Sequence, residues 1–379
     1  MSTVRRVMMI AGEASGDLHG AGVVRELLRR VPGIDVFGMG GEKMRNAGAD
    51  ILVHINDMAF MGFVEVVRNL PTVMRVERRL KAVLHERRPD AVLLIDYPDF
   101  NLRFARAVRS AGIPVFYYIS PQVWAWRGNR VKAMRRLVNK MFVIFPFEEE
   151  IYRRAGIPVE FVGHPLVEHL GVSCTRDEFL RRQGMEAGSK VLGLFPGSRV
   201  QEIEHIFPVM LDAARTLVRS TGVRVAVGVA PNLGAAALRG YIPPDVPVTL
   251  VEHATHDLMA YADAAVVTSG TATLETAWFG TPFLVVYRTS PLTFAIGRAL
   301  VRVPAIGLVN IVAGRKIVPE LIQHELTAAH VAEIAGRLLG DAGAAASIRK
   351  DLSIIRERLG APGASQRVVE SILAYGEAA

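Results

Sequence analysis

Short runs of apolar residues alternate along the whole chain with longer segments in which apolar residues recur every three or four positions. The first pattern is typical of buried strands and the second of amphipathic helices. Their regular alternation predicts parallel, doubly wound sheets. The strands expected in the first half are Val7–Ala11, Asp35–Met39, Ala91–Ile95, Val115–Ile119, Lys140–Ile144 and Val159–Val162.

A polar stretch, Ser173–Lys190, separates this half from a second one with the same pattern. We therefore expect an α/β fold of two Rossmann-like, doubly wound domains that face a central cleft at their carboxyl strand ends. The strands expected in the second half are Lys190–Phe195, Arg224–Val229, Val246–Val251, Ala264–Thr268 and Phe283–Tyr287, and the chain from Thr327 on is expected to be helical.

Two further helices are predicted near the N-terminus. A Gly-rich turn over Gly12–Asp17 precedes an expected helix over Leu18–Arg30. Pro71 suits the first turn of a second helix, in which Val73, Val76, Leu80, Val83 and Leu84 recur at helical spacing and should face the core.

The composition of the chain says more about which partners the protein can bind than about its fold. The chain has 379 residues, half of them hydrophobic, which suits two globular domains. A formal charge of +8 and a pI of about 9.8 suggest an anionic partner. No recognition-helix, zinc-finger or RNP pattern is present, so nucleic acid is not an expected partner. Cys174 is the only cysteine, which excludes an internal disulfide and suits a reducing compartment.

The stretch Ala265–Pro282 has the pattern of a phosphate-binding turn. A short apolar strand ends at Ser269-Gly270, and Thr271–Phe279 then fits a helix. Free N–H groups at a helix N-terminus and the helix dipole both favour an anion. Thr271 and Thr273 add hydroxyl groups. An ordinary capped turn between strand and helix is the alternative.

A second small-residue turn lies between a strand and a helix in the same half. It contains Gly197, Ser198 and Arg199. Glycine allows close approach of the backbone, and a guanidinium can bind phosphate oxygens in a bidentate manner. A capped helix with a surface arginine is the alternative, but the two turns together favour a diphosphate.

Carboxylates follow two strands of the first half. Asp96 and Asp99 come after Ala91–Ile95, and Glu13 comes after Val7–Ala11. A carboxylate at a strand end can act as general base on an incoming hydroxyl. We interpret Asp96 as the functional residue and Asp99 as a structural one, because Asp99 can cap the next helix.

Other polar and aromatic groups are less specific. Trp124 and Trp126 precede Arg127 and Arg130, a mixture that suits a lipidic phosphate or sugar, although packing beneath a loop explains the aromatic residues equally well. His164 at a strand end is more typical of a structural histidine. Glu252-His253 and His256-Asp257 lack a convincing ligand geometry, so no metal site is expected.

A dense apolar cluster precedes Pro71 and suggests contact with a membrane. Basic residues of the following helix, among them Arg75, Arg78, Arg79 and Lys81, would flank it on an anionic bilayer. A core helix over Met58–Val67 is the alternative. The cluster comprises Phe60, Met61, Phe63, Val64, Val66 and Val67.

Motifs along essentially the full length of the chain resemble the lipid-A-disaccharide synthase family. The matching stretches are AGEASGD from Ala11, MGFVEV from Met61, IDYPDFN from Ile95, SPQVWAWR from Ser120, FPFE from Phe145, GHPL from Gly163, PGSR from Pro196, SGTATLE from Ser269, YRTSP from Tyr287 and NIVAGRKIVPELIQ from Asn310.

The resemblance implies a GT-B glycosyltransferase that works by an inverting transfer without metal or cofactor. The donor would be UDP-2,3-diacylglucosamine and the acceptor 2,3-diacylglucosamine 1-phosphate, giving lipid A disaccharide 1-phosphate and UDP. The domains would be an acceptor- and membrane-facing domain over 1–168, a UDP-sugar domain over 169–350, and C-terminal helices over 351–379 that return to the first domain.

The resemblance also implies roles for individual residues. Asp96 would be the base, with Glu13 as a second catalytic candidate. The acceptor and membrane side would hold Phe60, Met61, Phe63, Val64, Val67, Arg75, Arg78, Trp124 and Trp126. The donor side would hold Ser198, Arg199, Ser269, Gly270, Thr271, Ala272, Thr273, Glu275, Asn310, Arg315, Glu320 and Gln323, with Glu320 as the ribose or uracil partner rather than a solvated helix carboxylate.

Two other functions remain open at this point. One is another GT-B enzyme that uses a UDP-sugar, such as an epimerase. The other is a non-catalytic nucleotide-binding protein at a membrane surface, which would have no use for Asp96. The resemblance implies a cytoplasmic protein on the inner face of the inner membrane, and a homodimer is left open.

Overall fold

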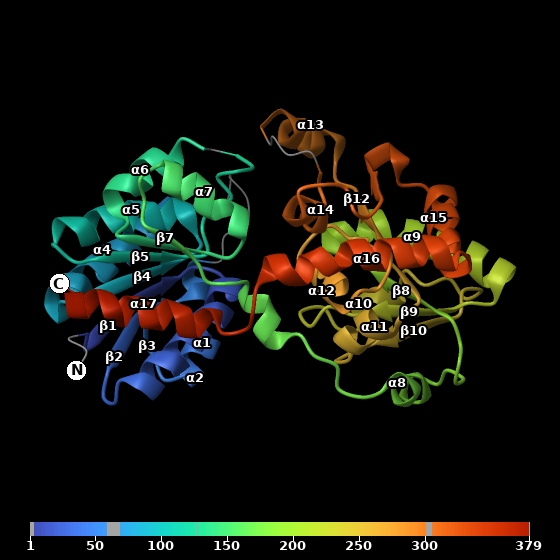
Figure 1. The fold of residues 1–379 in the computed structure, drawn as a ribbon, viewed down its shortest axis with the longest axis horizontal. Helices are drawn as coiled ribbons and strands as arrows, with labels where there is room; N and C mark the ends of the chain where they lie inside the picture. The colour runs from blue at the N-terminus through green and yellow to red at the C-terminus, as the bar shows by residue number, and fades with distance from the viewer. Residues whose placement is uncertain (1–3, 59–68, 127, 301–304, 379) are drawn as a thin grey trace. The chain divides into compact units, whose positions relative to one another are not determined.

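The computed structural model describes residues 4–58, 69–126, 128–300 and 305–378. The chain divides into two units, Met1–Glu168 with Leu359–Ala379, and His169–Arg358. Each unit contains one parallel sheet with helices on both faces (Figure 1). Two doubly wound Rossmann-like units are the fold class that the strand–helix alternation predicts.

The first sheet has seven strands in the order β3-β2-β1-β4-β5-β6-β7. The strand order reverses between β1 and β4, and Ala11 pairs with Ile95 at the carboxyl ends of these strands. Such a switch point is where open α/β sheets bind ligands. The strands are β1 (Arg6–Ala11), β2 (Asp35–Gly40), β3 (Asp50–His54), β4 (Ala91–Ile95), β5 (Val115–Tyr118), β6 (Lys140–Val143) and β7 (Val159–Phe161).

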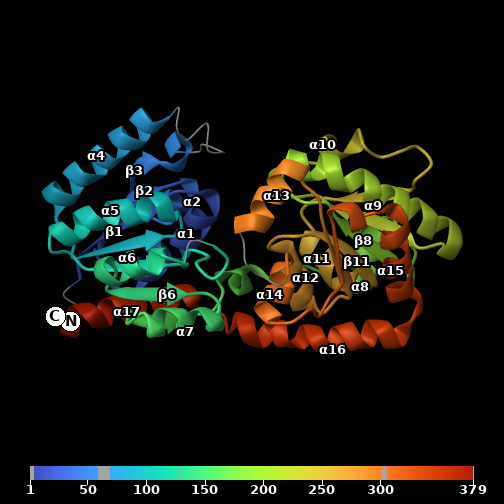
Figure 2. The same ribbon diagram turned by 90° about the horizontal axis from the view of Figure 1, so that it is seen from above.

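Helices cover both faces of this sheet (Figure 2). Alternate strand residues point to opposite faces, so Met8 and Ile10 join the core beneath α4, α5 and α6. The helices of this unit are α1 (Ala14–Arg30), α2 (Glu42–Asn46), α4 (Leu70–Arg87), α5 (Pro98–Ser110), α6 (Arg130–Leu137), α7 (Pro146–Arg154) and α17 (Ala364–Ala378), with 3₁₀ helices at Ile55–Met58 and Pro165–His169.

The Gly-rich segment Gly12–Asp17 is not the tight turn expected from its composition. Helix α1 begins at Ala14, four residues before the predicted start. A Cβ at Gly16 would lie 3.3 Å from the Cβ of Ala11, and one at Gly20 would lie 2.7 Å from the sulfur of Met44. The glycines therefore let the helix pack closely on the sheet.

The helix predicted after Pro71 is present as α4, with the proline in its first turn. Val73, Val76, Leu80 and Leu84 are buried against the sheet, as their spacing predicts. The opposite side of α4 exposes charged side chains.

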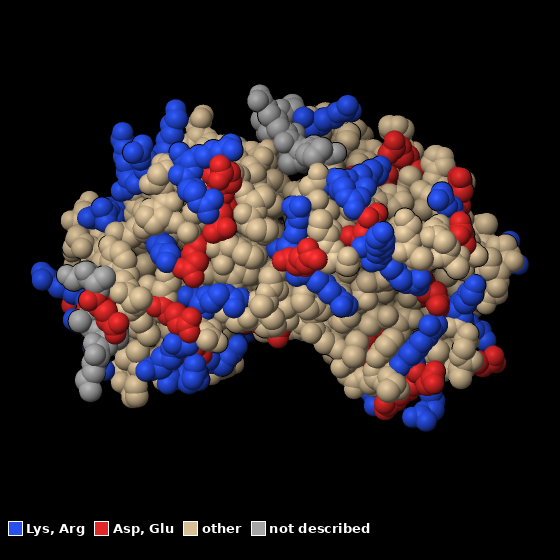
Figure 3. Space-filling model, viewed as in Figure 1, with Lys and Arg blue, Asp and Glu red and all other residues tan. Residues whose placement is uncertain are grey.

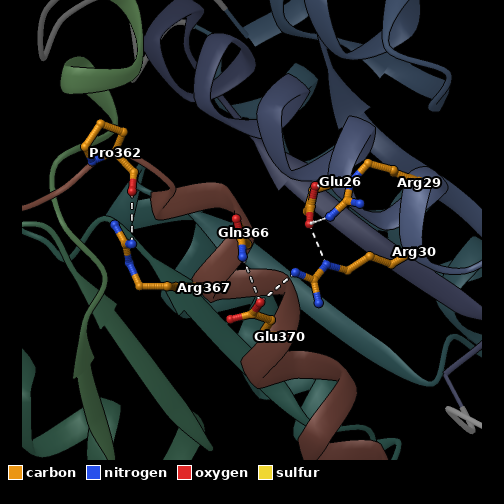
Figure 4. A network of polar contacts seen from close by, with 7 residues as sticks. All are labelled: Glu26, Arg29, Arg30, Pro362, Gln366, Arg367 and Glu370. Carbon is orange, nitrogen blue, oxygen red and sulfur yellow. Dashed lines mark hydrogen bonds and ion pairs between the residues drawn. The ribbon is translucent and has the colours of Figure 1, made fainter.

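Helix α17 returns to the first unit and packs beside α1. Arg30 bridges Glu26 of its own helix and Glu370 of α17 (Figure 4). The Arg367 guanidinium donates to the carbonyls of Val162, Ala361 and Pro362 at 2.9, 2.6 and 3.0 Å. These contacts fasten the C-terminal helix to the segment that follows β7.

The second sheet has six strands in the order β10-β9-β8-β11-β12-β13, with its switch point between β8 and β11. The strands are β8 (Val191–Phe195), β9 (Arg224–Gly228), β10 (Val248–Val251), β11 (Ala264–Thr268), β12 (Phe283–Tyr287) and β13 (Glu320–Ile322). The helices are α8 (Arg176–Arg182), α9 (Val200–Thr221), α10 (Ala236–Arg239), α11 (Thr255–Tyr261), α12 (Ala272–Phe279), α13 (Pro291–Leu300), α14 (Leu308–Ala313), α15 (Ala328–Gly340) and α16 (Ala342–Leu359), with a 3₁₀ helix at Gln323–Glu325.

The predicted strands are all present, with ends shifted by two residues at most. Two edge strands, β3 and β13, were not predicted. Strand β13 has only three residues and lies within a motif whose periodicity favoured a helix. Glu320 is consequently a buried strand residue and not a solvated helix carboxylate.

Candidate active site

Asp96 directly follows strand β4 and lies on the wall of a cavity of about 220 Å³ in the first unit. The cavity takes its walls from the start of α5, from the loop after β5 and from the start of α6. Its lining residues are Asp96, Pro98, Pro121, Gln122, Val123, Trp126 and Arg130. The cavity therefore combines one carboxylate, one guanidinium and several apolar surfaces.

The backbone at Asp96 is strained. Asp96 and Tyr97 have φ of 45° and 46°, in the left-handed region that non-glycine residues rarely adopt. Such a conformation costs about 1–3 kcal/mol per residue and persists only where the surroundings impose it. Here the Asp96 carbonyl accepts hydrogen bonds from the Tyr117 hydroxyl at 2.6 Å and from Asn101 Nδ2 at 2.7 Å.

Gly12 makes room for this turn. A Cβ there would lie 2.2 Å from Cδ1 of the Tyr97 ring, too close for any side chain. The residue after β1, Gly12, thus packs directly against the residue Tyr97 in the turn after β4, at the switch point of the sheet. The turn holds the Asp96 carboxylate half-buried at the cavity wall.

The environment of Asp96 brings its pKa close to neutral pH, and the carboxyl is still mostly ionised at pH 7. Burial and, to a smaller extent, the negative charge of Glu13 raise the pKa of the Asp96 carboxyl, and the N–H of Tyr97 lowers it; the net result is a pKa of about 6. A general base is most effective when its pKa lies near the working pH. Glu13 itself is exposed and precedes the first turn of α1.

Asp99 does not share this cavity. It stands in the first turn of α5, and the N-cap residue of that helix is Tyr97. Its carboxylate is 76% exposed and forms an ion pair with Arg130. Of the two aspartates after β4, Asp96 is the one that lines the cavity.

The two tryptophans of the loop after β5 have different environments. Trp124 Nε1 donates to Oε1 of Glu148 at 3.2 Å, and its ring is nearly perpendicular to the ring of Phe147, with the centroids 5.5 Å apart. Burial raises the pKa of Glu148 to about 7 although Ser120, Trp124 and a backbone N–H donate to it. Trp124 therefore packs beneath the loop, whereas Trp126 lines the cavity and is 39% exposed.

The second unit has its own cavity, of about 330 Å³, at the carboxyl ends of β8 and β11. It is bounded by the two turns that the sequence pattern identifies as phosphate-binding. The predicted donor residues on its wall are Ser198, Arg199, Ser269, Gly270, Thr271, Ala272 and Glu275. The structure thus brings the two turns together.

Thr273 is not on this wall. It is fully buried, and its hydroxyl donates to the carbonyl of Gly270 at 2.7 Å. Ser269 Oγ likewise donates to the carbonyl of Ile306 at 2.9 Å. These two hydroxyls shape the turn, whereas Thr271 at its tip is exposed.

Arg199 is 72% exposed and pairs with Glu202 at 2.8 Å. Gly197 has φ of 107°, and Glu202 packs against it. Asn232 Nδ2 donates to the carbonyl of Ser198 at 2.9 Å, which ties this turn to the loop after β9. The guanidinium therefore sits at the mouth of the cavity on a braced turn.

Two further polar groups lie on the same wall: Thr268, which no motif singled out, and Glu275, which the SGTATLE motif includes. Thr268 is the last residue of β11, and its hydroxyl is buried with no hydrogen-bond partner among the described residues. Burial raises the pKa of Glu275 to about 7. A buried polar group without a partner is costly, so the Thr268 hydroxyl suits contact with a ligand, and Glu275 lines the same cavity.

Four residues of the donor-side motif lie away from this cavity. Asn310 Nδ2 donates to Glu320 at 2.8 Å, and its Oδ1 accepts from the N–H groups of Ile317 and Val318. Glu320 in turn accepts from the N–H groups of Ile306 and Gly307, at 3.2 and 2.8 Å. Because Ile306 accepts from Ser269, this buried pair braces the turn indirectly.

Gln323 and Arg315 have separate contacts. The Gln323 side chain exchanges two hydrogen bonds with the backbone of Thr289, at 2.8 and 3.0 Å. Arg315 pairs with Asp351 at 2.6 Å on the surface. Both residues organise loops of the second unit.

A third cavity, of about 280 Å³, adjoins the second and shares Ala230, Pro231 and Thr255 with it. His253, with φ of 60°, and His256 line it. Its Asp257 is engaged by the N–H and hydroxyl of Ser173 and the N–H of Cys174. Among the described residues no cluster of His, Cys, Asp or Glu could hold a metal ion.

The apolar part of the predicted membrane surface lies outside the described residues. It comprises Phe60, Met61, Phe63, Val64, Val66 and Val67. In α4, Leu70 and Met74 are 45% and 46% exposed, one turn apart, beside the exposed Arg75 and Arg78. None of the described helices has both the length and the apolar character needed to cross a bilayer.

Comparison with known proteins gives the family. The sequence profile described as "Lipid-A-disaccharide synthetase" matches residues 7–367. A lipid-A-disaccharide synthase of Geobacter sulfurreducens is 45% identical over 374 residues, covering 98% of this chain and 97% of the relative. This chain belongs to the lipid-A-disaccharide synthase family. One from Syntrophus aciditrophicus is 47% identical over 364 residues, with 95% of each chain covered.

Solved structures agree on the fold. A UDP-GlcNAc 2-epimerase from Neisseria meningitidis aligns with TM-score 0.65 at 16% identity, covering 97% of this chain and all of the other. MurG from Acinetobacter baumannii aligns with TM-score 0.60 at 15% identity, covering 98% and 99%. The lipid-A-disaccharide synthase family membership makes this protein a glycosyltransferase, and these structures support the GT-B fold alone.

Proposed function

We propose that the protein joins UDP-2,3-diacylglucosamine to 2,3-diacylglucosamine 1-phosphate, releasing UDP and lipid A disaccharide 1-phosphate. The observation that carries the proposal is the Asp96 carboxylate, held by a strained turn at the wall of a cavity with its pKa raised to about 6. Acceptor chemistry needs such a base, whereas nucleotide binding alone does not.

In this proposal Asp96 removes the proton from the 6-hydroxyl of the acceptor. That oxygen bonds to the anomeric carbon of the donor sugar while the bond to the diphosphate breaks on the opposite side, so the configuration inverts. Raising the local concentration of the acceptor and aligning it lower the barrier further. UDP leaves with the electron pair of the broken bond.

The departing diphosphate would bind in the cavity of the second unit. The turns after β8 and β11 offer N–H groups, the hydroxyl of Thr271 and the Arg199 guanidinium. Fixed donors of this kind stabilise developing negative charge. We therefore expect the transfer to proceed without a metal ion, and the activity to persist in EDTA.

Glu275 suits the ribose hydroxyls better than Glu320 does. Glu275 lines the donor cavity, whereas Glu320 is buried in the network with Asn310. We propose that Asn310 and Glu320 position the Ser269 turn and that Glu275 accepts from the ribose. The adjoining cavity at His253 would take the base.

We also propose that α4 contributes to contact with an anionic membrane on its cytoplasmic side. The support is the exposed pair Leu70 and Met74 beside Arg75 and Arg78. Each basic residue near such a surface contributes about 1 kcal/mol, which salt removes. Binding to anionic vesicles should therefore weaken with rising ionic strength.

The direct test mixes the protein with UDP-diacylglucosamine, with and without the acceptor, and measures UDP. Acceptor-dependent release with formation of the disaccharide supports the transferase. Release without acceptor indicates hydrolysis or the elimination chemistry of an epimerase-like enzyme. Absence of release would contradict the proposed activity.

A further inference from the structure

The second charged group in the Asp96 cavity is Arg130, the first residue of α6. Its side chain is only 14% exposed, and it lines the same cavity as Asp96. Its guanidinium carbon lies 5.4 Å from the ring centroid of Trp126. A cation is thus held in a partly desolvated, partly aromatic environment next to the candidate base.

The positive charge of Arg130 is paired with a carboxylate that lies outside the cavity. Its ion-pair partner Asp99 does not line the cavity and is 76% exposed. A guanidinium has five N–H donors, and one carboxylate engages two of them at most in the bidentate geometry. Donors therefore remain for an anion that enters the cavity.

The surroundings of α6 are also basic. Lys132, Arg135 and Arg136 are exposed on this helix, and Figure 3 shows Lys and Arg atoms projecting from the part of the first unit where Figure 1 labels α6. A positive field of this kind attracts a phosphorylated ligand from solution. Arg130 is the member of this group that reaches the cavity wall.

We propose that Arg130 binds the phosphate of the acceptor, and that the sugar ring of the acceptor occupies the cavity between Arg130 and Asp96. This inference rests on the proposed function. A 6-hydroxyl and an anomeric phosphate lie at opposite ends of a hexose, so a base and a guanidinium on one cavity wall can engage both ends of one molecule. Arginine suits this role because its planar fork matches phosphate oxygens.

The size of the cavity agrees with this arrangement. A volume of about 220 Å³ corresponds to a cube with an edge of about 6 Å, enough for one sugar ring but not for acyl chains. The apolar lining by Pro121, Val123 and Trp126 can pack against the faces of the ring and the first carbons of the chains. Arg130 thereby becomes the residue that selects a phosphorylated acceptor.

The test measures kcat/KM for two acceptors, diacylglucosamine 1-phosphate and the same lipid without its phosphate, with wild type and Arg130→Ala. A hydrogen bond to a charged group corresponds to roughly a 10- to 150-fold change in affinity. We expect a loss of that order for the phosphorylated acceptor and a change of less than about threefold for the other. Equal losses for both acceptors would overturn the proposal.

Lys132→Ala is the matched control, because Lys132 lies on the same helix, is exposed and does not line the cavity. It should leave both acceptors unaffected. Melting temperatures of all variants check that they fold. Arg130→Lys, which keeps the charge but loses the fork, should retain part of the preference for the phosphorylated acceptor.

Asp99→Asn separates phosphate binding from a purely structural ion pair. If Arg130 serves the phosphate, removing the competing carboxylate should leave the affinity for the phosphorylated acceptor unchanged or tighten it two- to threefold. If the ion pair only fixes α6, Asp99→Asn should be as harmful as Arg130→Ala, which would contradict the proposal.

Failure of the proposed function gives a different result. In that case wild type releases no UDP with either acceptor. Equilibrium dialysis of both lipids in detergent against wild type and Arg130→Ala then tests the inference without turnover. Phosphate-dependent binding that Arg130→Ala abolishes would support it, and binding that does not depend on the phosphate would overturn it.

Discussion

The cavity of the second unit is walled mainly by two turns of small residues, after β8 and β11, whereas the cavity of the first unit is walled by side chains from several separated segments around Asp96. Backbone N–H groups and Arg199 are available in the former. A single half-buried carboxylate and Arg130 dominate the latter. The cavity of the second unit therefore suits binding of a diphosphate, and the cavity of the first unit suits transfer of one proton.

The backbone differs in the same way. The turn at Ser269 uses glycine where φ is positive and satisfies its hydroxyls internally. The turn at Asp96 places two non-glycine residues in the left-handed region and secures them with Tyr117 and Asn101. Of these two turns, the strained one is therefore the turn that orients the Asp96 side chain, and not the turn at Ser269 whose backbone N–H groups would bind the diphosphate.

The largest effect should come from Asp96→Asn. The change preserves the shape of the side chain and removes its basicity, so kcat should fall by roughly 10²- to 10⁴-fold. Steady-state UDP release with saturating donor and acceptor measures it. A variant that keeps more than about a tenth of the wild-type kcat would show that another group is the base.

Arg199→Ala should have the next largest effect. Loss of a hydrogen bond to a charged group costs about 1.5–3 kcal/mol, which corresponds to a 10- to 150-fold fall in kcat/KM for the donor. Arg219→Ala is the control, since Arg219 is an exposed residue of α9 outside the cavity. If both variants behave alike, the diphosphate does not bind where the two turns meet.

Tyr117→Phe should act on the first unit alone and more mildly. It removes the 2.6 Å hydrogen bond to the Asp96 carbonyl and leaves that of Asn101. A net hydrogen bond of about 1 kcal/mol corresponds to a fall in kcat of about fivefold, with the donor KM unchanged. A lower melting temperature with an unchanged kcat would show that the hydrogen bond from Tyr117 to the Asp96 carbonyl is purely structural.

The smallest effect concerns the pH profile. Asp96 must be ionised to act, so activity should fall as the pH drops through about 6. Because the charge of Glu13 raises the pKa of Asp96, Glu13→Gln should move the acidic limb of the kcat/KM profile to lower pH. An unchanged or higher midpoint would contradict electrostatic coupling between these carboxyls.

The pattern of apolar residues predicted most of the fold because each predicted strand is followed within three residues by Gly, Pro or a polar residue. It missed β13, whose three residues are too few to show a period of two. It also placed the start of α1 too late, because Gly12–Asp17 was interpreted as a turn, whereas the close contact of Gly16 with Ala11 requires a small residue inside the helix.

The donor cavity could be anticipated because its residues are contiguous in two short motifs, and the two turns meet at one switch point. The contacts of Asn310 and Glu320 could not, since they depend on β13 and on the backbone at Ile306. Thr268 gave no signal beyond its position, and the sequence pointed to Arg130 only as part of the aromatic and basic mixture that includes Trp126. Their significance comes from burial and from the cavities they line.

The central claim is that UDP binding and proton transfer are carried by different units. Calorimetric titration of UDP into Asp96→Asn and Arg199→Ala tests it most directly. We predict that the dissociation constant of the Asp96 variant equals that of wild type within about twofold, while that of the Arg199 variant rises by at least about tenfold. Weakened UDP binding in the Asp96 variant, or unchanged binding in the Arg199 variant, would contradict this division of roles between the units.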